Sequence, residues 1–85
     1  MITRSDEEYV LRQVCRRARG ARTRTFTLNA RGLGIDVRGL LAAVLRKLEA
    51  QAGVRIIART IYKNKRSKYV VDADALRRAC SSFLS

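Results

Sequence analysis

The chain has 85 residues, with 19 Lys and Arg against seven Asp and Glu, so its net charge at pH 7 is +12. Hydrophobic residues make up 47% of the sequence, which excludes a disordered basic tail, and no apolar run approaches the roughly 18 residues of a membrane span. The absence of His removes the commonest acid–base catalyst, and two distant cysteines cannot supply a zinc site. We therefore expect one domain, residues 1–85, without enzymatic activity, cofactor or metal.

The charge indicates the class of partner. A domain this small and this basic attracts polyanions, and nucleic acid is the leading candidate. The cations are spread over several segments and do not collect on one amphipathic helix, so we expect no membrane partner. Fifteen of the 19 cations are Arg, which suits bidentate contacts with phosphate or guanine, although a GC-rich genome would also enrich Arg. Because no secretory signal is recognised, the expected location is the cytoplasm, in association with the nucleoid.

The first predicted element is a helix. Ser5 and Glu8 have the spacing of a capping box, apolar residues follow at helical spacing, and Gly20 marks the end. Five Arg cluster around this end and the loop that follows it, Arg22 and Arg24 among them. Such a run is either a solvated surface or a phosphate contact without base specificity.

Two cysteines fall on the apolar faces of the first and last predicted helices. Cys15 and Cys80 have no second ligand spacing nearby, so the ordinary interpretation is two small buried hydrophobic residues. A disulfide between the two helices is the alternative.

The middle of the chain predicts a strand, a turn and a long helix. Residues 23–28 alternate as a short strand, and residues 29–35 contain two Gly and turn the chain. Residues 36–52 have apolar side chains at helical spacing, with Asp36 as the cap and Gly53 as the stop. The opposite face combines cations with small side chains: Arg38, Gly39, Ala42, Ala43, Arg46 and Lys47. Such a face is either a solvated helix surface or one that lets backbone approach a grooved anionic partner.

A basic hairpin and a last helix complete the chain. Residues 54–62 and 69–71 are rich in β-branched residues and predict two strands, with four cations in the tip at residues 63–68. This tip is either an ordinary exposed turn or a contact with phosphate or the minor groove. The last helix, residues 73–85, is capped by Asp72. Its apolar face either covers the first helix or forms a homodimer contact through Leu76, Phe83 and Leu84.

The middle of the chain, about residues 24–72, resembles the winged helix-turn-helix family of DNA-binding domains. The residues that carry the resemblance are Ala30, Leu33, Gly34, Ile35, Asp36, Leu40, Val44, the run Leu45-Arg46-Lys47-Leu48-Glu49, and Gly53-Val54. The resemblance implies an α+β fold in which residues 36–52 enter the major groove and the hairpin tip is the wing. Asn29 and Gly32 depart from the family pattern and indicate that the first helix of the motif is one distorted turn.

The resemblance also implies which residues meet the nucleic acid. The groove-facing row would be Arg38, Ala42 and Arg46, and the wing contacts would be Lys63, Lys65, Arg66 and Lys68. We therefore expect a double-stranded DNA-binding protein, either a transcriptional regulator or a chromatin-type protein, with mainly electrostatic affinity and weak sequence specificity. A structured-RNA-binding or ribosome-associated protein is the alternative, and a module that binds an acidic protein is a third.

Overall fold

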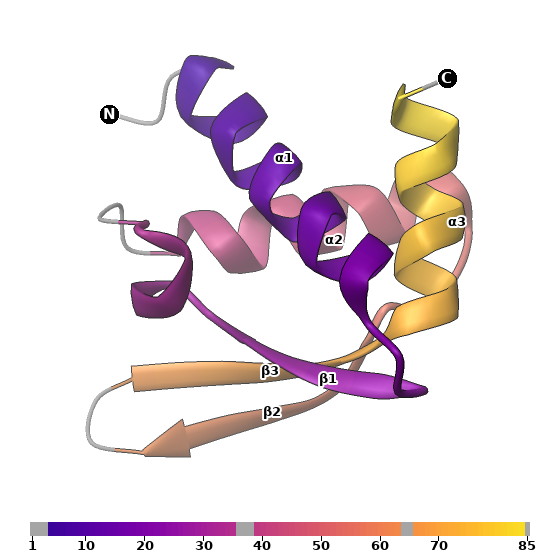
Figure 1. The fold of residues 1–85 in the computed structure, drawn as a ribbon. Coiled ribbons are helices and arrows are strands. Elements are labelled where there is room, and N and C mark those ends of the chain that lie inside the picture. The colour runs from indigo at the N-terminus through magenta and orange to yellow at the C-terminus, as the bar shows by residue number, and fades with distance from the viewer. Residues whose placement is uncertain (1–3, 36–38, 64–65, 85) are drawn as a thin grey trace.

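The computed structural model describes residues 4–35, 39–63 and 66–84. The elements follow in the order α1 (Arg4–Gly20), β1 (Thr25–Asn29), the 3₁₀ turn η1 (Arg31–Leu33), α2 (Leu40–Ala52), β2 (Ile57–Lys63), β3 (Arg66–Asp72) and α3 (Ala73–Leu84). Within these ranges, three α-helices lie on one side of an antiparallel sheet with the strand order β1-β3-β2 (Figure 1). The predicted α+β class and the order of its elements are confirmed.

α1 supplies one wall of the hydrophobic core. Val10, Val14 and Ala18 recur at helical spacing and are fully buried. The helix begins at Arg4, so Ser5 lies inside its first turn and the predicted capping box is wrong. Across the described ranges, no helix has both the length and the apolarity needed to cross a bilayer.

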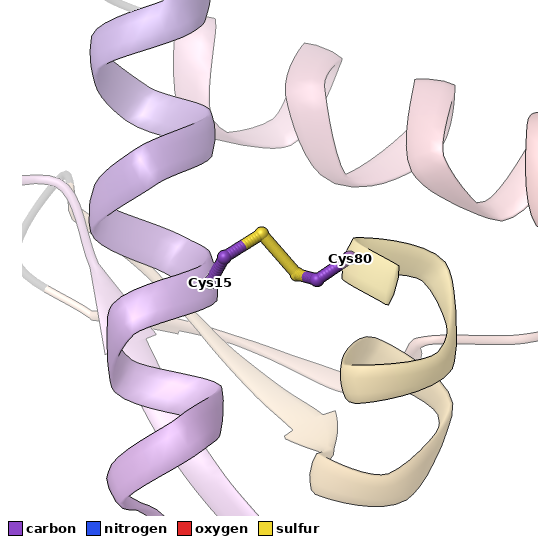
Figure 2. The surroundings of a disulfide bond; sticks show 2 residues. All are labelled: Cys15 and Cys80. Carbon is purple, nitrogen blue, oxygen red and sulfur yellow. A yellow bond between two sulfur atoms is a disulfide. The ribbon is translucent and has the colours of Figure 1, made fainter. Parts of the chain in front are cut away.

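A disulfide joins the first and last helices. Cys15 of α1 and Cys80 of α3 are bonded, with their Cα atoms 5.8 Å apart (Figure 2). The two residues are only 1% and 5% exposed, as their apolar positions predict. The interpretation as two separate small hydrophobic residues is nevertheless wrong, because α1 and α3 lie side by side and bring the sulfurs together.

α2 is shorter at its start than the sequence predicts. It begins at Leu40, directly after Gly39. Gly39 has a positive φ of 78°, in the left-handed region, and is therefore not part of the right-handed helix. The Gly39 carbonyl accepts the first hydrogen bond of the helix from the Ala43 N–H at 3.0 Å. Asp36, the predicted cap, lies outside the described residues. At the other end the predicted stop is confirmed, because Gly53 has a φ of 68°.

The connection from β1 to α2 contains the single distorted turn that the sequence predicts. η1 has three residues, and the Asn29 side chain accepts a hydrogen bond from the Gly32 N–H at 2.6 Å. The turn closes on Gly34, whose φ is 69°. Tyr9 of α1 donates its hydroxyl to the Leu33 carbonyl at 3.2 Å and so holds the turn against the first helix.

The carboxylate of Glu49 fixes the passage from α2 into β2. Its Oε2 atom accepts hydrogen bonds from the backbone N–H groups of Ile56 and Ile57, at 2.8 and 2.9 Å. β2 and β3 then pair from Ile57 to Lys63, so the strands extend further towards the tip than predicted. Of the expected tip, Lys63, Arg66, Ser67 and Lys68 are strand residues.

α3 packs within the same chain. The Asp72 carboxylate accepts a hydrogen bond from the Ala75 N–H at 3.0 Å, which confirms the predicted cap. Leu76 is fully buried in the core, so the dimer contact proposed for it is wrong, and its face covers the chain's own helices. The side chains of Phe83 and Leu84 lie outside the described residues, and a dimer through them stays a prediction.

Candidate nucleic-acid interface

The solvent-exposed side of α2 carries small residues and two cations, Arg46 and Lys47. Five apolar residues of the helix are buried: Leu40, Leu41, Val44, Leu45 and Leu48. Ala43, Arg46 and Ala50 are exposed on the opposite side, at the spacing of one helical row. Of the predicted groove-facing row, Arg46 is exposed, whereas Ala42 is half-buried and Arg38 lies outside the described residues. The row that faces solvent is therefore Ala43, Arg46 and Ala50, which we call the α2 outer row.

The other flank of α2 is occupied by α1. A shallow depression of about 270 Å³ between the two helices is lined by Glu7, Glu8, Leu11, Val44, Lys47, Leu48 and Gln51. Lys47 and Glu7 form an ion pair across it at 3.3 Å. Lys47 was grouped with the exposed cations of the helix, but its charge is partly neutralised by α1. Lys47 follows Ala43 by four residues and is itself exposed, so it borders the α2 outer row on the side of α1.

The β2–β3 hairpin carries cations on one face of the sheet. The register pairs Arg59 with Val70, Ile61 with Lys68 and Lys63 with Arg66, and cross-strand partners lie on the same side of a sheet. This side is opposite to the one that contains the buried Leu28 and Val71, because side chains alternate along each strand. We call Arg59, Lys63 and Lys68 the hairpin cations; all three are exposed.

Two of the predicted wing contacts cannot be placed as side chains. Lys65 lies outside the described residues, and Arg66 is described in its backbone alone, as the strand partner of Lys63. Arg59 was missed by the sequence analysis, which treated only the tip as basic. The pattern that could have identified it is the spacing of Arg59, Ile61 and Lys63, which follow one another at intervals of two residues along a run rich in β-branched residues. In a strand this spacing places all three on one face.

The hairpin extends past the core. Tyr62 is 67% exposed, although alternation places it on the side of the sheet that carries the helices. Figure 1 shows the loop end of the hairpin on the left of the view, below η1 and the start of α2. The hairpin end and the N-terminal part of α2 are thus found at the same end of the fold.

Arg22 and Arg24 are exposed but lie far from the hairpin end. They precede β1, whose first residue, Thr25, pairs with Asp72 at the far end of β3. β3 runs from Arg66 to Asp72, so about 20 Å of strand separates Thr25 from the hairpin end. The fold therefore does not bring these two Arg together with the hairpin cations.

Few of the cations are neutralised by acidic side chains. Among the described residues, ion pairs join Lys47 to Glu7 and Arg77 to Asp74, and neither involves the α2 outer row or the hairpin cations. The charge on both surfaces is therefore open to an external anion.

Comparisons with known proteins identify no relative. No model of a protein family, no curated protein and no solved structure matches this chain.

Proposed function

We propose that this chain is a double-stranded DNA-binding domain of the winged helix-turn-helix type, acting as a small transcriptional regulator or a chromatin-type protein. α2 enters the major groove with its outer row leading, and the β2–β3 hairpin follows the backbone as the wing. The turn that closes on Gly34, the long helix after it and the basic hairpin after that helix support this assignment.

The observation that carries the proposal is the absence of bulk on the α2 outer row. An α-helix with ordinary side chains is about 10–12 Å across, close to the 12 Å width of the major groove. Ala43 and Ala50 make this face slimmer and leave Arg46 as its one long side chain among the described residues of the row. Such a helix can approach the floor of the groove, and Arg46 can reach a phosphate or a guanine edge.

The affinity in this proposal is mainly electrostatic. Alanine side chains offer no hydrogen-bond donor to a base edge, so sequence specificity is weak. The hairpin cations contact phosphates. If about six to eight phosphates are neutralised, the logarithm of affinity falls against the logarithm of salt concentration with a slope of roughly −5 to −7.

The first experiment measures that slope by fluorescence anisotropy on a labelled duplex. A slope near zero contradicts the mechanism. Competition with a structured RNA at equal salt separates DNA from the alternative partner, because preference for the RNA would favour the ribosome-associated interpretation. Sedimentation of the free protein at the same concentration reports whether it forms a homodimer.

The second experiment tests the orientation of α2. Ala43→Glu places a carboxylate on the outer row, and Gln51→Glu places one on the exposed flank beside α1. Both change the net charge equally. We expect Ala43→Glu to weaken duplex binding by about tenfold or more because it faces phosphate directly, and Gln51→Glu to weaken it by about twofold. Equal effects would contradict the proposed docking.

A further inference from the structure

The exposed face of α1 carries a row of arginines that the proposed DNA contact does not use. Arg12, Arg16 and Arg19 follow one another at the spacing of a single helical face, and all three are exposed. We call them the α1 arginine row. The opposite face of the same helix contains the fully buried Val10 and Val14. The row therefore points away from the core.

The α1 arginine row lacks acidic partners in the described part of the chain. The ion pairs found there are Lys47–Glu7 and Arg77–Asp74, and none reaches Arg12, Arg16 or Arg19. Glu8 precedes Arg12 by one helical turn without coming within ion-pairing distance. Like charges three and four residues apart repel one another and oppose helix formation. An external polyanion would remove this repulsion.

The α1 arginine row and Arg46, the cation of the α2 outer row, face in opposite directions. Val44 and Leu48 line the depression against α1, and Arg46 lies two residues from each. Successive side chains of an α-helix point in directions about 100° apart around the helix axis. Arg46 therefore points to the side of α2 away from α1. In Figure 1, α1 crosses in front of α2. The buried Val10 and Val14 of α1 belong to the same core cluster as Val44 and Leu48 of α2, so the core face of α1 is directed towards that helix. The helical layer thus separates the two basic rows.

This separation decides what the α1 arginine row can bind. The domain measures 31 × 27 × 22 Å, so a straight duplex seated on α2 and the hairpin cannot also lie along the outer side of α1. We propose that the α1 arginine row binds a second DNA duplex, so that one molecule joins two duplex segments. This inference rests on the proposed function, because it assigns the first duplex to α2 and the hairpin.

The test is a bridging assay with two duplexes. One duplex is attached to beads, a fluorescent duplex of the same sequence is free, and the protein is added below saturation. The test variant is Arg12→Gln with Arg16→Gln. The matched control is Arg55→Gln with Arg78→Gln. It also removes two exposed cations, one from the segment before β2 and one from α3. Binding of each protein to a single duplex is measured in parallel by anisotropy.

The parent protein is expected to recover the fluorescent duplex with the beads. Recovery by the test variant should fall about tenfold, because two phosphate contacts of the second duplex are lost, while its single-duplex affinity changes by less than about threefold. The control variant and Arg12→Lys with Arg16→Lys should retain recovery. Circular dichroism of each variant confirms that the helices are intact.

Three outcomes overturn the inference. If the test and control variants recovered the fluorescent duplex equally, bridging would depend on the total charge or on a protein dimer and not on the α1 arginine row. A parent protein that binds one duplex and recovers no second one would end the inference and leave the proposed function standing. A parent protein that binds no duplex at all would end both.

Discussion

Cys15 of α1 and Cys80 of α3 form a disulfide that closes a loop with a sequence separation of 65 residues. Both residues are buried, so the bond lies in the core, where it links the helix that carries the α1 arginine row to the last helix. A domain of this size buries a modest core, and a covalent link across it removes many conformations from the unfolded chain.

Reduction of this disulfide should destabilise the protein strongly. For a loop of this length, the chain-entropy relation gives a loss of about 4 kcal/mol in the free energy of unfolding. Urea denaturation of protein refolded with and without reductant measures the difference. The reductant must be added to the unfolded protein, because the sulfurs are buried in the native state. Cys15→Ala with Cys80→Ala should be insensitive to reductant, and a shift below about 1 kcal/mol in the parent would show that the bond contributes little.

Removal of the Glu49 carboxylate should loosen the junction of α2 and β2. Glu49→Ala leaves the N–H groups of Ile56 and Ile57 without their acceptor, so we expect a loss of about 2–3 kcal/mol. Gln51→Ala, an exposed position on the same helix, should change stability by less than about 0.5 kcal/mol. Urea midpoints of the two variants make the comparison. Equal midpoints would mean that water replaces the carboxylate at little cost.

A side chain at Gly34 should disturb the turn before α2. The φ of this residue is 69°, and an added Cβ atom would lie 3.2 Å from the Tyr9 hydroxyl oxygen. Gly34→Ala is therefore expected to cost about 1–2 kcal/mol, measured by thermal or urea denaturation. Gly20→Ala meets no atom within 4 Å and is the matched control, with an effect near zero or slightly stabilising. If Tyr9→Phe restored Gly34→Ala fully, the hydroxyl contact alone would explain the cost.

Neutralisation of the hairpin cations should lower the salt dependence of DNA binding. Arg59→Gln, Lys63→Gln and Lys68→Gln each remove one phosphate contact in the proposed complex. Each should reduce the magnitude of the slope of log affinity against log salt by about 1. Arg55→Gln, exposed just before β2, should leave the slope unchanged. If Arg55→Gln had the same effect as Arg59→Gln, the outer face of the hairpin would not be a distinct contact surface.

Much of the fold could be predicted from local patterns. Apolar residues at helical spacing predicted α1, the body of α2 and α3, because one face of each helix must be buried wherever the helix packs. Gly53 predicted the end of α2 because glycine readily adopts the left-handed backbone that ends a helix. Asp72 predicted the start of α3 because its carboxylate can accept a hydrogen bond from a backbone N–H of the first turn. The start of α2 was misplaced because Asp36 resembles a cap, whereas the left-handed backbone at Gly39 delays the helix.

The candidate site was predicted less well. Arg46, Lys63 and Lys68 are exposed as expected, but Ala42 is half-buried and Ala43 takes its place on the outer row. Arg59 and Arg12 were overlooked because a count of clustered cations does not report which face each side chain occupies.

The sequence by itself determined the elements, their order and the excess of positive charge, because these depend on spacing along the chain and on composition. The tertiary structure decided the pairing of Cys15 with Cys80, the strand register that aligns Arg59 with Lys63 and Lys68, and the division of the arginines between opposite sides of the helical layer. Such relationships join residues that are distant in the chain. They follow from how helices and strands pack against one another, which local spacing does not encode.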